Sequence, residues 1–184
     1  MMFLQHYHYK CMIKQVIIFV LRRGGDAEMM MMMMMRENNI KCRHQLIWVK
    51  ENPVFSMGRL DYDYQHEPIL YGWKKTHNFI GKGQYLKSVW HIKRTENKLH
   101  PTMKPVELVC NAILNSSNIN NIILDVFCGS GSTLIACEKT SRICYGMELD
   151  EHYCDVIVKR YYDWMVANNK EPVIKLNGKN YEPC

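Results

Sequence analysis

Three features are missing from this sequence of 184 residues, and each absence argues against a class of protein. The apolar run Val16 to Leu21 is far shorter than the roughly 20 residues that cross a membrane. Lys14 interrupts any longer run, which also argues against a signal peptide. No Gly-Lys-Ser/Thr segment is present, so a Walker-type phosphate loop is excluded. No membrane association is therefore expected.

The third missing feature is a pair of cysteines at metal-binding spacing. The chain has eight cysteines, but no two of them form a Cys-x-x-Cys pair, and no histidine spacing typical of zinc sites accompanies them. Several cysteines fall within predicted strands or helices, where a reduced thiol packs as a small apolar group. We therefore expect reduced cysteines, no bound metal ion and a cytoplasmic protein.

The composition is that of a globular domain, with 47% hydrophobic and 23% charged residues. The length is sufficient for one domain with its own core. The net charge of +6 is unevenly spread, because the segment from Lys74 to Lys104 contains eight Lys or Arg residues and one acid, Glu96. Aromatic residues alternate with these cations at Trp73, Phe79, Tyr85 and Trp90. Such a segment suits a phosphate backbone and unstacked bases, and a solvated loop with a few core aromatics is the alternative.

The most informative stretch combines short apolar runs with a glycine-rich loop. Its parts are, in order, the apolar run 122–124, Asp125, a loop with Gly129 and Gly131, a helical segment over 132–139, the apolar run 143–147 and Glu148. Strand, glycine loop, helix, strand and acid is the order of a nucleoside-binding βαβ unit. The glycines allow a sharp turn and let a ligand approach the main chain closely.

The loop residues narrow the choice of nucleoside. A dinucleotide fingerprint needs a third glycine where Leu134 stands. With an acid before the loop and no cation to neutralise a phosphate, a ligand with an amino acid end fits better. S-adenosylmethionine (SAM) has an ammonium group that Asp125 could hold and a ribose that Glu148 could hold. On spacing alone, a SAM site and an unrelated βαβ crossover both stay open.

Motifs around this unit carry a family resemblance. His100-Pro-Thr-Met-Lys-Pro105 precedes the unit, and Asp125-Val-Phe-Cys-Gly-Ser-Gly131 lies inside it. The chain resembles the DNA amino-methyltransferases of the permuted type, in which HPTxKP precedes DPFxGSG and a Gly-x-Glu-x-Asp follows. Segments 47–50, 58–62 and 66–72 share the resemblance, which covers roughly residues 37 to 165. Val126 replaces the usual proline of the motif, and Cys128 replaces a commonly small residue.

The resemblance implies an α/β, Rossmann-like fold of the SAM-dependent methyltransferases, here with an incomplete central sheet. It implies transfer of a methyl group from SAM to adenine N6 or cytosine N4 in double-stranded DNA, as in restriction–modification. The cofactor residues it suggests are Asp125, Phe127, Gly129, Ser130, Gly131 and Glu148, with Thr102 and His100 at the methionine end. The candidates for DNA phosphate contacts are Lys82, Lys87, Lys93 and Arg94.

One motif of the resembling enzymes does not occur. Their catalytic tetrapeptide contains Pro-Pro, and this chain has no two adjacent prolines. Family spacing would place the tetrapeptide before Met1, so we expect an N-terminally truncated copy that lacks an N-terminal half or a partner subunit. Because that loop orients the target amine, no catalytic residue is predicted. A silent remnant or partner subunit, which binds SAM and DNA without transferring methyl, is the alternative to an active enzyme.

The expected organisation has three parts. They are a divergent, low-complexity segment 1–36, a methylase domain 37–169 with a DNA-facing basic loop 73–98 and a cofactor half 99–165, and a tail 170–184. The predicted elements are strands over 16–21, 45–49, 68–71 and 173–176, and helices over 27–38, 106–115 and 150–168. The methionine run 29–35 has good helix propensity and no expected packing role.

Two smaller expectations concern individual side chains. Ser130 or Ser132 is expected to cap the helix that follows the glycine loop. His66 and Glu67 form a possible acid/base pair, but methylation of an amine needs little acid/base help. A structural or base-contacting role is therefore preferred for these two residues.

Overall fold

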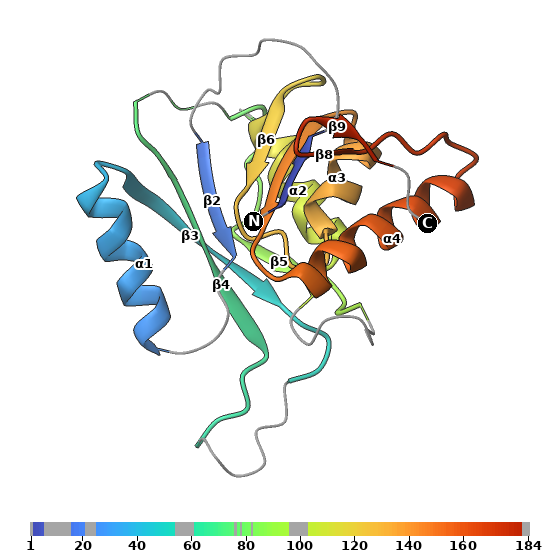
Figure 1. The fold of residues 1–184 in the computed structure, drawn as a ribbon. Helices are drawn as coiled ribbons and strands as arrows, with labels where there is room; N and C mark the ends of the chain where they lie inside the picture. Colours follow the sequence, from blue (N-terminus) through green and yellow to red (C-terminus); the bar gives the residue numbers. More distant parts are fainter. Residues whose placement is uncertain are drawn as a thin grey trace. The chain divides into compact units, whose positions relative to one another are not determined.

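The computed structural model describes residues 2–5, 16–20, 25–53, 61–75, 77, 79–81, 83–95 and 103–181 (Figure 1). The chain divides into two compact units, one formed by Met1–Ile13 with Thr95–Cys184 and the other by Lys14–Arg94. Each unit has its own mixed β-sheet, with both parallel and antiparallel pairs. None of the described helices combines the length and the apolar composition that a membrane span requires.

The first unit is built around the predicted βαβ segment. Strand β6 (Ile122–Asp125), helix α3 (Ser132–Thr140) and strand β7 (Ile143–Glu148) follow one another, and β6 and β7 are parallel. Strand β1 (Met2–Gln5) pairs antiparallel with β7. The hairpin of β8 (Lys175–Leu176) and β9 (Lys179–Asn180) completes the order β6-β7-β1-β8-β9. The parallel crossover predicted from the glycine loop is confirmed.

Two further helices are described in this unit, and both were predicted. Helix α2 (Val106–Ser116) starts directly after Pro105, whose fixed φ and missing N–H suit the residue at a helix start. Helix α4 (Glu151–Ala167) is capped by Asp150, whose side chain accepts a hydrogen bond from the His152 N–H. Apolar faces of α2, α3 and α4 share one core with β7, with Leu134, Ile157 and Tyr161 among its buried members.

The described residues of the second unit form a four-stranded sheet in the order β2-β4-β3-β5. The strands are β2 (Val16–Val20), β3 (Lys41–Val49), β4 (His66–Trp73) and β5 (Val89–His91). Strand β4 pairs antiparallel with both β2 and β3, whereas β5 runs parallel to β3. Strand β5 was not predicted, because three residues within a basic, loop-like segment give no periodic signal.

The methionine run forms part of helix α1 (Gly25–Glu37), which packs beside β3 (Figure 1). Met35 is buried against Leu70 of β4, and Met31 lies one helical turn earlier against the same cluster. The other methionines from Met29 to Met34 are largely exposed. The expectation that the run has no packing role is therefore wrong for Met31 and Met35, because spacing of four residues places both on one face.

Candidate cofactor-binding site

Two carboxylates lie at one edge of the sheet in the first unit. Strands β6 and β7 are parallel, and Asp125 is paired in register with Gly146, two residues before Glu148. The carboxyl ends of parallel strands are where open α/β sheets bind their ligands. Asp125 and Glu148 therefore stand on adjacent strands at the edge where a ligand is expected.

The Asp125 carboxylate is held by the loop and by the helix that follows it. Its Oδ1 accepts a hydrogen bond from the Phe127 N–H at 3.0 Å, and its Oδ2 accepts one from the Thr133 hydroxyl at 2.6 Å. A carboxylate has about four lone-pair sites, so these two bonds fix its orientation without using its full accepting capacity. Thr133 was not predicted as a site residue, because a threonine in the first turn of a helix is common.

Glu148 ties the glycine loop to the end of β7. Its Oε2 accepts from the Gly129 N–H at 2.7 Å, and its Oε1 accepts from the Leu149 and Asp150 N–H groups at 2.8 and 3.1 Å. Three charge-assisted hydrogen bonds to main-chain donors make this carboxylate a fixed point of the site. The acid at the end of the second strand thus also shapes the loop.

The two glycines of the loop adopt left-handed backbone conformations, with φ of 53° at Gly129 and 78° at Gly131. The loop turns back on itself, since the Gly131 N–H donates to the Cys128 carbonyl at 2.8 Å. A Cβ on Gly131 would lie 3.0 Å from Ile157 Cγ2 on α4. Gly131 is therefore required both by its φ and by the close approach of α4.

Two apolar side chains beside the carboxylates are open to solvent. Phe127 is 79% exposed and Leu149 is 81% exposed, each next to one of the two strand ends. Large exposed apolar side chains at the ligand-binding edge of a sheet are candidates for contact with an aromatic ligand.

The two loop serines do not cap α3, which corrects the prediction from sequence. The N-cap is Gly131, and no side chain caps the helix start. Ser130 and Ser132 are both buried, and the Ser132 hydroxyl donates instead to the Lys104 carbonyl at 2.6 Å. This bond joins the end of the HPTMKP segment to the glycine loop.

The basic residues predicted for DNA contacts lie in the second unit. Lys87, Lys93 and Arg94 are exposed, around and just after strand β5. Lys93 forms an ion pair with Glu51 at 3.1 Å, with both side chains largely exposed. Exposure leaves these cations accessible to a phosphate backbone.

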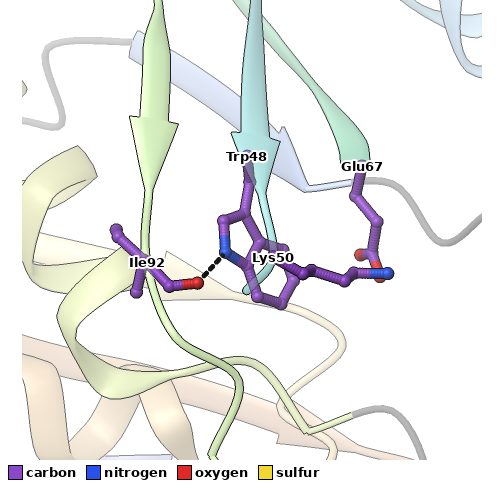
Figure 2. Close-up of polar contacts among 4 residues, drawn as sticks. All are labelled: Trp48, Lys50, Glu67 and Ile92. Atoms are coloured by element: carbon purple, nitrogen blue, oxygen red, sulfur yellow. Dashed lines mark hydrogen bonds and ion pairs between the residues drawn. The ribbon is translucent and has the colours of Figure 1, made fainter. Parts of the chain in front are cut away.

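A buried ion pair lies at the end of β3 in the same unit. Lys50 is 3% exposed, and its Nζ is 2.6 Å from Glu67 Oε1. The Trp48 indole N–H donates to the Ile92 carbonyl at 2.8 Å, and the Lys50 ammonium lies 5.5 Å from the Trp48 ring centroid (Figure 2). These contacts join the ends of β3, β4 and β5, directly before Lys93. They agree with a structural role for Glu67.

Among the residues that the structure describes, no group of three or more His, Cys, Asp or Glu side chains is arranged to hold a metal ion. The six described cysteines all have free thiols, and five of them are buried.

Comparison with known proteins adds an independent observation. The family model N6_N4_Mtase, described as DNA methylase, matches residues 9–159. The chain belongs to this DNA methylase family. The resemblance to the DNA amino-methyltransferases is thereby confirmed, whereas the permuted motif order and the truncation stay predictions.

The curated proteins to which this DNA methylase is similar are longer than the chain. Type II methyltransferase M.HinfI from Haemophilus influenzae is 32% identical, over 64% of this chain and 38% of its own length. Type II methyltransferase M2.MboI from Moraxella bovis is 29% identical, over 70% of this chain and 52% of its own length. The chain thus spans about half, or less, of the length of these relatives.

Solved structures support the fold of this DNA methylase. The complex of M1.HpyAVI with SAM aligns with a TM-score of 0.69 and 27% identity, covering 80% of this chain and 74% of that protein. The cytosine-N4-specific PvuII DNA methyltransferase aligns with a TM-score of 0.64, covering 79% and 62%. Its identity is 15%, so this second likeness concerns the fold alone. The predicted α/β methyltransferase fold with a partial sheet is confirmed.

Most cofactor residues suggested by the sequence of this DNA methylase lie on one stretch of one unit. The loop and strand ends bring together Asp125, Phe127, Gly129, Ser130, Gly131 and Glu148. His100, Thr102 and Lys82 lie outside the described residues. Sequence reasoning missed Thr133, which donates to Asp125, and Arg160 of α4, whose Nη1 donates to the Ser130 carbonyl at 2.8 Å. In the second unit it missed the burial of Lys50. The one sequence signal for the burial of Lys50 was its position directly after the apolar strand 45–49.

Proposed function

We propose that this DNA methylase binds SAM at the carboxyl edge of β6 and β7 and serves methyl transfer to an exocyclic amine of a DNA base. The observation that carries the proposal is the pair of fixed carboxylates, Asp125 and Glu148, on either side of a glycine loop. Family membership supports the reaction class, and adenine N6 and cytosine N4 are the two amines that the family name covers.

Each group of the candidate site suits one part of this ligand. Asp125 would accept hydrogen bonds from the ammonium group, and Glu148 would accept them from the ribose hydroxyls. The exposed Phe127 ring would stack on the adenine. The N–H groups at the start of α3 would face the carboxylate of SAM, since a helix N-terminus favours an anion.

The charge of the site favours SAM over phosphate-bearing nucleotides. A dinucleotide or a nucleoside triphosphate would bring negatively charged phosphates next to the carboxylates of Asp125 and Glu148. Like charges that lie close together repel each other. Within the described residues, no lysine or arginine forms an ion pair with either carboxylate. A ligand with an ammonium and no phosphate avoids this repulsion.

The proposed reaction is a direct displacement. SAM supplies a methyl group on a sulfonium centre, and the amine nitrogen of the base attacks it. The N–C bond forms as the C–S bond breaks, the electron pair goes to sulfur, and the amine loses one proton to solvent. No residue of the chain is assigned to holding the target amine, because the Pro-Pro tetrapeptide expected from the resemblance does not occur in these 184 residues.

The proposed second partner is double-stranded DNA. Support comes from the net charge of +6 and from the exposed cations Lys87, Lys93 and Arg94. Contacts of lysine and arginine with phosphates position a protein on DNA without reading its sequence. The target base and the recognition sequence are not assigned.

Ligand titration tests the proposal. Isothermal titration of the 184-residue chain with SAM, and separately with its demethylated product, should show saturable one-site binding. NAD and ATP, at the same concentrations, should bind at least about tenfold more weakly, because of their phosphates. Preferential binding of NAD, or no binding of SAM, would contradict the proposed function.

A further inference from the structure

Arg160 on α4 makes three hydrogen bonds to the glycine loop. Its Nη1 donates to the Ser130 carbonyl at 2.8 Å, to the Ser130 hydroxyl at 3.1 Å and to the Ser132 hydroxyl at 3.2 Å. Its periodic position on α4 predicts only core packing, so Arg160 was not expected to take part in the site. A single nitrogen that serves three acceptors on one loop is a specific arrangement.

The acceptors of Arg160 belong to a chain of contacts that crosses the site. Ser132 accepts from Arg160 and donates to the Lys104 carbonyl at 2.6 Å. Ser130 is 4% exposed and Ser132 is 6% exposed, so their polar atoms need partners inside the protein. Arg160 thus joins α4, the glycine loop and the end of the HPTMKP segment.

Helix α4 also shapes the loop from beneath through Ile157. Ile157 lies one turn before Arg160 and therefore on the same face of the helix. It approaches Gly131 so closely that a Cβ there would lie 3.0 Å from it. Two neighbouring side chains of α4, one apolar and one charged, thus fix the path of residues 130–132.

The guanidinium of Arg160 lacks an acidic partner in the described part of the chain, where no carboxylate forms an ion pair with it. Burial lowers the pKa of Arg160, so its charge carries a desolvation cost that a purely structural contact could avoid with a neutral donor. A positive charge beside the start of α3 adds to the field of the helix N-terminus.

We propose that Arg160 is a positioning residue of the cofactor site, holding residues 130–132 so that the N–H groups at the start of α3 face the amino acid end of the ligand. The inference rests on the proposed binding of SAM and adds a residue to that site. Arg160 acts through the loop and touches no reacting atom.

The test compares two ligands that differ at that end. S-adenosylhomocysteine has an amino acid end, and 5′-methylthioadenosine lacks it. Arg160→Met should lower the affinity for S-adenosylhomocysteine by about tenfold or more, since it removes the hydrogen bonds that a charged donor makes to the loop. The same variant should lower the affinity for 5′-methylthioadenosine by about twofold at most. Arg160→Lys should recover part of the loss, because one ammonium can reach the Ser130 carbonyl but lacks the guanidinium geometry.

Lys159→Met is the matched control, because Lys159 is the neighbouring α4 residue, is exposed and pairs with Asp163. It removes the same charge and should leave both affinities unchanged. If Arg160→Met does not fold, Arg160→Lys and Ser130→Ala carry the same comparison. Equal loss of both ligands, or unchanged affinity for S-adenosylhomocysteine, would overturn the inference and leave the proposed function intact. Failure of the unaltered chain to bind S-adenosylhomocysteine would overturn both.

Discussion

Cys128, within the glycine loop, shows how burial sets the chemistry of a single residue. Its side chain is buried, and its thiol donates to the Asp125 carbonyl at 3.4 Å. Burial raises the pKa of this thiol well above its ordinary value, and the nearby Asp125, Cys144 and Glu148 raise it further. Cys128 therefore stays neutral near pH 7 and packs as a small apolar residue, as its place in the motif suggested.

The raised pKa of Cys128 has a consequence for stability at alkaline pH. Above its ordinary value of 9.0, the unfolded chain loses the thiol proton while the folded chain keeps it. The free energy of unfolding should then fall as pH rises, by up to about 1.4 kcal/mol per pH unit for this one group. Urea unfolding between about pH 8 and pH 10 should show a shallower fall for Cys128→Ala than for the unaltered chain.

Cys42→Ala, at an exposed cysteine, is the control and should reproduce the slope of the unaltered chain. Identical slopes for Cys128→Ala and Cys42→Ala would show that Cys128 ionises equally in the folded and unfolded states.

Residues of the site differ in how far sequence alone can assign them. Asp125, Gly129, Gly131 and Glu148 form a local pattern within one βαβ unit, and local patterns are visible in a sequence. Arg160 is 30 residues from Ser130, and only the packing of α4 against the loop brings them together. The capping role of Ser130 and Ser132 was predicted wrongly, because their hydroxyls satisfy distant groups instead of the helix start.

At the level of elements, the parallel crossover and the helices were predictable because their signals are periodic and contiguous. The buried contact of Lys50 with Glu67 at the end of β3 was not predictable in this way. The pairing of β3 with β4 aligns Trp48 with Glu67, and this non-local register brings the Lys50 side chain to its partner. Lysine is rarely buried, so composition would place Lys50 on the surface. Its burial follows from a partner 17 residues further along the chain.

The buried Lys50–Glu67 pair makes a prediction about stability. Lys50→Met should lower the free energy of unfolding by about 3–5 kcal/mol, the range for removing one partner of a buried ion pair. The double variant Lys50→Met/Glu67→Leu should recover most of that loss, because it removes both charges. Urea unfolding of the three proteins measures the difference.

The exposed pair of Lys93 and Glu51 supplies the comparison for this element. Lys93→Met should cost less than about 1 kcal/mol, as solvent screens that pair. A Lys50→Met variant no less stable than Lys93→Met, or a double variant as unstable as the single one, would contradict a buried pair at the end of β3.

At the level of the whole molecule, the two proposed binding surfaces lie on different compact units. The carboxylate edge belongs to the unit that contains residues 95–184, and the exposed cations belong to Lys14–Arg94. The uneven distribution of charge was predictable from the sequence, because local composition alone reveals it. The division of the chain into these units depends on long-range pairing, such as that of β1 with β7, which composition does not reveal.

DNA affinity should depend on the cations of the second unit. Replacing Lys87, Lys93 and Arg94 together by Gln should flatten the plot of log K against log salt concentration by up to about 2.7, near 0.9 per lost phosphate contact. Fluorescence anisotropy with a labelled duplex, at a series of salt concentrations, measures the slope. A triple variant of Lys139, Lys159 and Lys179, all exposed in the first unit, removes the same charge and should change the slope less. Equal slopes for both triple variants would assign DNA contacts elsewhere.

The central claim is that the two strand-end carboxylates of this DNA methylase hold SAM, and calorimetric titration of Glu148→Ala with S-adenosylhomocysteine tests it most directly. Removing a charged hydrogen-bond acceptor for the ribose should cost roughly 1.5–3 kcal/mol, an affinity loss of about ten- to a hundredfold. Glu151→Ala, at an exposed acid in the first turn of α4, controls for charge and should bind as the unaltered chain does. Equal affinity in Glu148→Ala and Glu151→Ala would contradict the account.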